Sequence, residues 1–276
     1  MDGLTTRELL ELMHVEDRNG IESVHAALEQ IAKAVDQVAE RLRSGGRLHY
    51  FGAGTSGRLA VLDAAECPAT FGVAADLVQA HAAGDGEAED DFGLGVRDAK
   101  HAGLSSLDAV IGVSASGRTA YVLAAVGEAR EAGALVVGLS CAPGTPLGAA
   151  AAIAIEVDVG SEVIAGSTRL KAGTAQKVAL NMISTGVFMR LGHTYRGRMV
   201  GVVTSNDKLR RRAGRMVREL TGCSSEMVET ALRDAGGSAK VAILMLRFGI
   251  DADDARNRLS GASGDLAVAL GERARR

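Results

Sequence analysis

The chain has 276 residues with a formal net charge of -3, and 47% of them are hydrophobic, which suffices for one large α/β domain and a small appendage. This charge offers no basic field for nucleic acid, and a 3% aromatic content without tryptophan removes the rings on which single strands stack. With three scattered cysteines, no histidine spacing typical of a metal site, no signal peptide and no apolar run of about 18 residues, we expect a cytoplasmic protein without disulfides, metal or membrane contact.

The sequence pattern of residues 1–46 predicts helices. Thr5-Thr6-Arg7-Glu8 has the spacing of a capping box, which predicts that a helix begins there. Apolar residues then recur in steps of three and four from Ile21 to Leu42, and Gly45-Gly46 follows. This narrow apolar stripe either packs on a sheet or forms the helix–helix seam of a dimer.

Residues 47–204 alternate strands with helices. Strands are expected at 48–51, 77–81, 109–113, 135–139 and 153–159, and helices from about 57, from about 87, over 117–132 and over 171–191. Continuous apolar strands separated by helices indicate a doubly wound parallel sheet in a flavodoxin-like three-layer sandwich. Residues 205–276 contain shorter, charged helical stretches broken by glycines, which predicts a small helical subdomain. Its basic run, 208–218, is interpreted as a solvated helix face in preference to a nucleic-acid contact.

The sequence Ser-Gly-Arg-x-Ala occurs twice, at 56–60 and 116–120, each time directly after a predicted strand. Such a turn from strand to helix aims unpaired backbone N–H groups and the positive end of the helix dipole at one place, which suits a phosphate. In parallel sheets, ligands collect at the carboxyl ends of the strands, so both loops are expected to hold one small ligand, a phosphorylated sugar. Any one hydroxyl could instead be an ordinary helix cap. The candidate ligand contacts are Gly54, Thr55, Ser56 and Gly57 in the first loop, and Ser114, Ser116, Gly117 and Thr119 in the second.

The first loop also satisfies the GxGxxG pattern of dinucleotide-binding folds through Gly52, Gly54 and Gly57. That interpretation needs an acid at the tip of the second strand, where the sequence runs from His81 into Ala82-Ala83-Gly84. It also leaves the second serine loop unexplained. We therefore favour a sugar phosphate over a dinucleotide.

Three stretches, 52–72, 112–122 and 160–192, resemble the N-acetylmuramic acid 6-phosphate etherases, a family of sugar-isomerase-type (SIS) proteins. Looser similarity continues from 204 into the helical tail. The third stretch is highly specific, although the longer, duplicated glucokinase regulatory proteins share it. Aldose–ketose isomerases of the same fold match it only at Glu162 and Ser167-Thr168.

The resemblance implies an enzyme that removes D-lactate with water to give N-acetylglucosamine 6-phosphate, without metal or redox cofactor. The family's catalytic glutamate falls on Glu66 in Glu66-Cys67-Pro68, and a second functional glutamate falls on Glu89. The sugar-phosphate contacts fall on the two serine loops and on Ser167. We assign protonation of the leaving group and activation of water to Glu66, and C2 proton abstraction or ring opening to Glu89. Two other functions stay open: a non-catalytic regulator that senses a phosphosugar, and an SIS aldose–ketose isomerase.

The position of Glu66 also bears on assembly. If 57–66 is helical, Glu66 lies about 14 Å from the first loop. Pro68 disfavours a helical Cys67, so we expect Glu66 at the end of that helix. A hexose phosphate is too short to span this distance comfortably. Either Glu66 acts on a sugar held by the other subunit of a homodimer, with sites near the subunit interface, or the helix breaks early.

Overall fold

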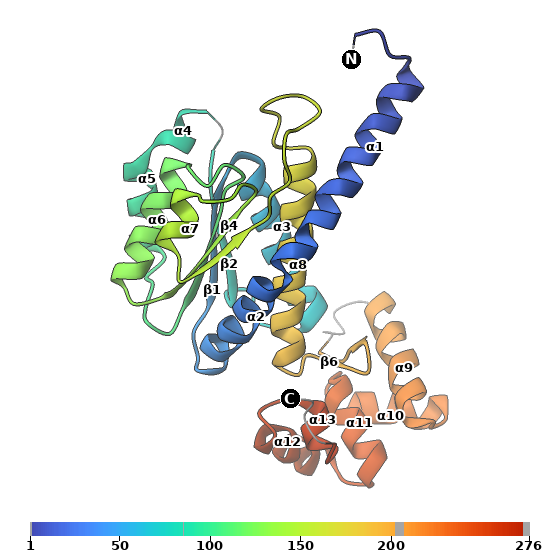
Figure 1. Cartoon of the computed structure of the whole chain (residues 1–276). Helices are drawn as coiled ribbons and strands as arrows, with labels where there is room; N and C mark the ends of the chain where they lie inside the picture. Colours follow the sequence, from blue (N-terminus) through green and yellow to red (C-terminus); the bar gives the residue numbers. More distant parts are fainter. Residues whose placement is uncertain (1, 85, 202–206, 273–276) are drawn as a thin grey trace. The chain divides into compact units, whose positions relative to one another are not determined.

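A computed structural model describes residues 2–84, 86–201 and 207–272 (Figure 1). The chain forms two compact units. The first combines the chain up to Ala65 with Ala75–Val187, and the second combines Glu66–Ala74 with the chain from Phe188 onward. The predicted domain bounds at 46/47 and 204/205 stay a prediction, and the second of them lies outside the described residues.

The first unit is built on a parallel sheet of five strands in the order β2-β1-β3-β4-β5. This confirms the predicted doubly wound sheet, because the order 2-1-3-4-5 is that of flavodoxin-like folds. Every residue of the three central strands is buried, as expected for apolar strands covered on both faces. The strands are β1 (Leu48–Ala53), β2 (Val78–Ala83), β3 (Ala109–Val113), β4 (Leu135–Ser140) and β5 (Ile153–Glu156).

Helices cover both faces of this sheet (Figure 1). One face carries α5 (Phe92–His101), α6 (Ala120–Glu131) and α7 (Pro146–Ala150), whose core includes Phe51, Tyr121 and Leu147. The other face carries α2 (Leu28–Arg43), α3 (Gly54–Phe71) and α8 (Lys171–Arg190), and α2 buries Ile31, Val38 and Leu42 there. The short helix α4 (Glu87–Asp90) follows β2.

The N-terminal helix α1 (Thr6–Ser23) begins at the predicted capping box. The amide of Thr5 donates to Glu8 Oε2 at 2.8 Å and the amide of Glu8 donates to Thr5 Oγ1 at 3.3 Å, which confirms that prediction. The helix runs unbroken to Ser23, and a 3₁₀ turn, η1 (Val24–Ala27), joins it to α2. Most of α1 is exposed, and an ion pair between Glu16 and the buried Lys171 ties it to the first turn of α8.

Helix α3 continues through Pro68 to Phe71. The expectation that the helix ends at Glu66 is therefore wrong, and so is the alternative that it breaks early. Packing within the second unit holds its last turn: Phe71 is 5% exposed, its ring stacks on Phe188 at 4.5 Å, and its carbonyl accepts from His193 Nδ1 at 2.8 Å. These contacts offset the steric restriction that proline places on the residue before it.

The second unit consists mainly of short helices around a core of its own, formed by residues such as Val217, Ala242, Leu244 and Leu266. Four of these helices begin at a residue whose side chain accepts from the next turn: Ser224, Ser238, Asp251 and Asp265. The elements are the two-stranded ribbon β6 (Thr194–Tyr195) and β7 (Arg198–Met199), then α9 (Asp207–Thr221), α10 (Ser225–Asp234), α11 (Ala239–Phe248), α12 (Ala252–Gly261) and α13 (Leu266–Ala269). None of the described helices is long and apolar enough to cross a membrane.

Candidate active site

The two serine loops leave the same edge of the sheet. β1 and β3 are parallel neighbours in which Gly52 pairs with Val113, so the loops after these strands start side by side. Neighbouring strands lie about 4.8 Å apart. The structure therefore brings the first loop, 54–57, and the second loop, 114–119, to one place, as the sequence predicts.

In the second loop, hydroxyl groups gather around Gly117. Ser114 Oγ accepts from the Gly117 amide at 3.1 Å and lies 2.8 Å from Thr119 Oγ1. Ser116 Oγ accepts from the Arg118 amide at 3.2 Å, and its side chain is exposed. Thr119 precedes α6, yet its side chain makes no capping hydrogen bond. Ser116 Oγ also lies 3.4 Å from Ser114 Oγ, so the three hydroxyls of this loop form one cluster whose protons can be donated to a ligand.

A tight turn fixes this hydroxyl cluster. Gly117 has φ +62°, a conformation that suits glycine, and a methyl group on it would lie 2.4 Å from Thr145 Cβ. Its carbonyl accepts from the Leu147 amide at 3.0 Å. Thr145 is in turn held by Glu156, whose Oε1 accepts from its hydroxyl at 3.0 Å. The second loop is thus held in place by Thr145 and Leu147 at the start of α7, and through Thr145 by Glu156 of β5.

The first loop is held by α8. Ser56 is 8% exposed, and its hydroxyl donates to Gln176 Oε1 at 2.9 Å. Thr55 Oγ1 accepts from Arg58 Nη2 at 3.2 Å, and a methyl group on Gly173 would lie 3.6 Å from Thr55 Cγ2. Gly57, the fourth residue expected here, is buried. The first turns of α8 therefore form one wall of this loop.

Gln176 is the residue that the sequence reasoning missed. Its side chain is 1% exposed, and its Nε2 is buried without a hydrogen-bond partner among the described residues. An unpaired buried donor costs free energy, so this amide is a candidate to donate a hydrogen bond to a ligand at the first loop. Its position in the specific stretch 160–192 is the one signal that could have identified it.

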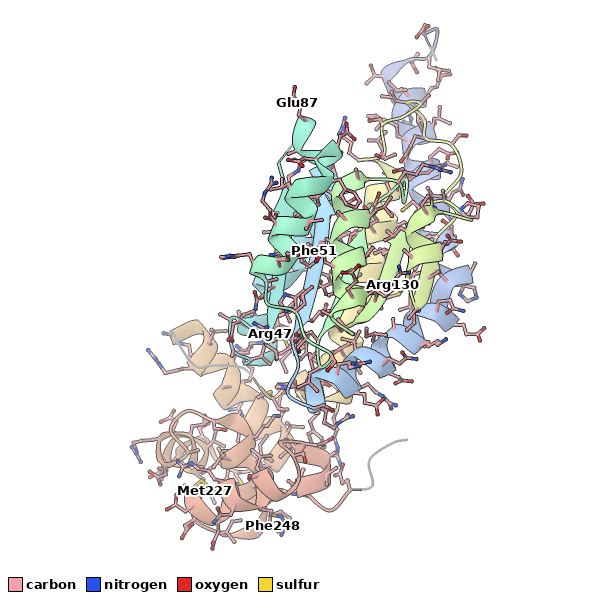
Figure 2. The ribbon with its side chains drawn as sticks, turned by 90° about the vertical axis from the view of Figure 1, so that its left-hand side faces the viewer. Arg47, Phe51, Glu87, Arg130, Met227 and Phe248 are labelled. Carbon is pink, nitrogen blue, oxygen red and sulfur yellow. The ribbon has the colours of Figure 1, made fainter. Side chains whose placement is uncertain are left out.

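Glu89 lies against the first loop. It belongs to α4, and its carboxylate lies so close to Gly54 that a methyl group there would be 2.5 Å from Oε1. Gly54 has φ +52° and begins α3, whose unpaired N–H groups favour a negative charge. Glu87 of the same helix is exposed and projects from its tip (Figure 2). The structure thus brings one of the two predicted catalytic glutamates to the serine loops.

Glu66 is exposed on α3 and belongs to the second unit. Nine residues of unbroken helix separate it from Gly57. Glu66 thus belongs to the second unit, whereas Glu89 and the serine loops belong to the first.

The segment after β5 caps α8. Glu162 accepts from the amides of Lys171 and Ala172 at 3.2 and 3.0 Å, so its carboxylate already neutralises the start of this helix. Ser167 is half-buried, and its amide donates to Ile164 O at 2.9 Å. Ser167 lies in the turn before α8, and among the described residues its hydroxyl makes no hydrogen bond with either serine loop.

Burial, with a smaller contribution from the Glu162 carboxylate, raises the pKa of the Cys141 thiol to about 12, which makes it a poor nucleophile. Within residues 2–84, 86–201 and 207–272, no group of three or more His, Cys, Asp or Glu side chains is placed to hold a metal ion.

Comparisons with known proteins agree with this geometry. The SIS domain family matches residues 18–141. The N-acetylmuramic acid 6-phosphate etherase of Rubrobacter xylanophilus is 51% identical over 99% of this chain and 92% of its own length. That of Aeromonas hydrophila is 45% identical over 97% and 92%. A phosphoheptose isomerase from Francisella tularensis shares the fold, with a TM-score of 0.52 and 19% identity over 67% of this chain and all of the isomerase.

Proposed function

The chain belongs to the N-acetylmuramic acid 6-phosphate etherase family and is therefore an enzyme, and we propose that it cleaves the D-lactyl ether of N-acetylmuramic acid 6-phosphate with water, giving N-acetylglucosamine 6-phosphate and D-lactate. The observation that carries this proposal is the Glu89 carboxylate beside the first of two adjacent hydroxyl-bearing loops, in a chain that matches etherases over nearly its whole length. The phosphoheptose isomerases share only the fold at 19–20% identity, and no relative reported above favours a non-catalytic regulator.

We place the phosphate in the second loop. Ser114, Ser116 and Thr119 offer hydroxyls there, and the residues of this loop include no acid. The first loop instead faces the carboxylate of Glu89, which would repel a phosphate dianion at close range. The start of α8 is unsuitable as a phosphate site because its N–H groups already donate to the carboxylate of Glu162. The reacting end of the sugar therefore lies toward the first loop and Glu89.

This orientation matches the chemistry. In the open-chain sugar the C1 aldehyde acidifies the C2 proton, which Glu89 removes. The C3–oxygen bond then breaks, and the departing lactate oxygen takes a proton from Glu66. Water then gives a proton back to Glu66 as its oxygen adds to C3, and the protonated Glu89 returns its proton to C2, so both glutamates are regenerated. General acid–base catalysis of this kind contributes roughly 10²–10⁴-fold per group.

We propose a homodimer in which Glu66 serves the site of the second copy. The unbroken α3 supports this proposal, because an early break in the helix was the alternative. The same helix exposes Val61 at 44% and Leu62 at 50%, and α8 exposes Met182 at 40%. Exposed apolar side chains on neighbouring helices are typical of an interface. Leu62 and Glu66 are four residues apart, so they share one face of α3, and a dimer through this face would present Glu66 to the partner. We also propose that the protein is cytoplasmic.

Release of D-lactate tests the function. Purified protein incubated with N-acetylmuramic acid 6-phosphate should release D-lactate and form N-acetylglucosamine 6-phosphate in equal amounts. Isomerised substrate with no lactate would favour an aldose–ketose isomerase, and binding without turnover would favour a regulator.

Two substitutions and one control test the assigned residues. Glu89→Gln and Glu66→Gln should each lower turnover by about 10²-fold or more. Glu87→Gln alters the same short helix as Glu89 at an exposed position and should leave turnover unchanged. Normal turnover by Glu66→Gln or Glu89→Gln would remove that residue from the mechanism.

A further inference from the structure

The second unit contains an open cavity lined by solvent-exposed arginines. It lies between α9 and α10 and has a volume of about 720 Å³. Four arginines reach it from α9 and one from α10: Arg210, Arg211, Arg215, Arg218 and Arg233. This volume falls within the range of roughly 300–1,000 Å³ that is usual for small-molecule sites.

The arrangement of charge distinguishes this cavity from an ordinary solvated helix face. Arg211, Arg215 and Arg218 are four and then three residues apart, so one face of α9 carries all three toward α10. Like charges at this spacing destabilise a helix. Among the residues that the structure describes, no carboxylate forms an ion pair with any of the three. An anion bound between them would remove this repulsion.

The other lining residues indicate what kind of anion fits. Guanidinium groups bind phosphate through two parallel hydrogen bonds, which makes phosphate the expected charged group. Val228 and Leu232 of α10 provide an apolar wall. Glu229, the one acid in the lining, accepts hydrogen bonds, so it favours a ligand that also carries hydroxyl groups.

We propose that this cavity, here called the arginine pocket, is a second binding site that takes a phosphorylated sugar, either a free sugar phosphate or the ribose phosphate of a nucleotide. The phosphate contacts Arg211, Arg215 and Arg218, the ring lies on Val228 and Leu232, and a ring hydroxyl donates to Glu229. The site lies wholly within the second unit and does not depend on the function proposed for the serine loops.

Titration calorimetry on the full chain tests this proposal with three probes: AMP, N-acetylglucosamine 6-phosphate and inorganic phosphate. AMP should bind once per chain if the source is a nucleotide. If the source is a free sugar phosphate, N-acetylglucosamine 6-phosphate should bind at a site whose affinity falls in Arg211→Ala/Arg215→Ala, whether or not it also binds at the serine loops. Inorganic phosphate should bind more weakly than the favoured probe, because it lacks the ring and the hydroxyls.

The decisive comparison uses arginines of the same helix. Arg211→Ala/Arg215→Ala should weaken binding at the arginine pocket by roughly tenfold or more. Arg212→Ala removes an exposed charge next to Arg211 that does not line the cavity, and it should change binding little. Arg215→Lys keeps the charge without the planar fork and should give a partial loss. Thermal melting checks that each variant is folded.

Three results would overturn the proposal. The first is that each probe binds the wild type, the double variant and the Arg212→Ala control with the same affinity. Another is inorganic phosphate binding as tightly as either organic probe. The third is a single-stranded oligonucleotide binding far more tightly than AMP and N-acetylglucosamine 6-phosphate, which would assign these arginines to a nucleic-acid surface.

Discussion

Adding one methyl group to Gly54 should displace Glu89. In Gly54→Ala the new Cβ would lie 2.5 Å from Glu89 Oε1, so the carboxylate must move by about 0.9 Å to reach an ordinary contact of 3.4 Å. Misplacing a reacting group by about 1 Å can cost 10²-fold in rate. We therefore expect kcat/KM for lactate release to fall by about 10²-fold.

Backbone strain is a separate effect of the same substitution. Gly54 has φ +52°, and a side chain in this conformation costs roughly 1–2 kcal/mol. Gly103→Ala is the matched control, because Gly103 has φ +62° and a methyl group there meets nothing within 4 Å. Both variants should melt at a similarly lowered temperature, while only Gly54→Ala loses activity.

A double variant shows whether the loss acts through the carboxylate. If Gly54→Ala works by moving Glu89, adding it to Glu89→Gln should cost little further activity, since the shared partner is already removed. The reasoning is refuted if Gly54→Ala destabilises the protein as Gly103→Ala does and leaves kcat/KM unchanged. Fully additive losses in the double variant would equally contradict it.

Two further predictions concern groups that the fold buries. Gln176→Glu should raise KM by roughly tenfold, because it replaces the buried Nε2 donor with an acceptor and adds a negative charge beside the first loop; an unchanged KM would exclude this pair from substrate binding. Burial, with smaller contributions from His81 and Arg47, lowers the pKa of His49 to about 4. Since the folded state resists protonation of His49, the contribution of this group to stability is complete above its ordinary pKa of 6.5 and is lost as the pH falls, by about 2 kcal/mol at about pH 5. Denaturant unfolding at about pH 7.5 and 5 measures this loss, and an equal loss in His49→Leu would contradict the assignment.

The sheet and the meeting of the serine loops could be predicted from the sequence. Apolar strands such as 109–113 are continuous because both faces of a parallel sheet are covered, and the register of β1 with β3 then places their loops together. The capping box at Thr5 is equally local, since its hydrogen bonds join residues three apart. Local patterns of this kind predict the structure correctly because tertiary packing favours the same conformation.

Other features depend on contacts that local patterns do not contain. In the sequence, Pro68 indicates a helix end. The helix continues past it because Phe71 is held by the Phe188 ring and by His193, both more than 110 residues away. The bond between Ser56 and Gln176 spans 120 residues, so neither residue indicates its partner. The basic run 208–218 reads as a solvated face, because nothing in it shows that α10 supplies the opposite wall of a cavity. The roles of Glu66 and Glu89 stay predictions.

The claim on which the proposed mechanism depends is that each site combines the serine loops and Glu89 of one copy with Glu66 of the other. Glu66→Gln and Glu89→Gln chains with different affinity tags can be co-expressed and purified as a mixed dimer. Such a dimer holds one site with both substitutions and one with none, so its lactate release should recover to about half of the wild-type value. A mixed dimer as inactive as either parent would show that Glu66 does not act across the interface.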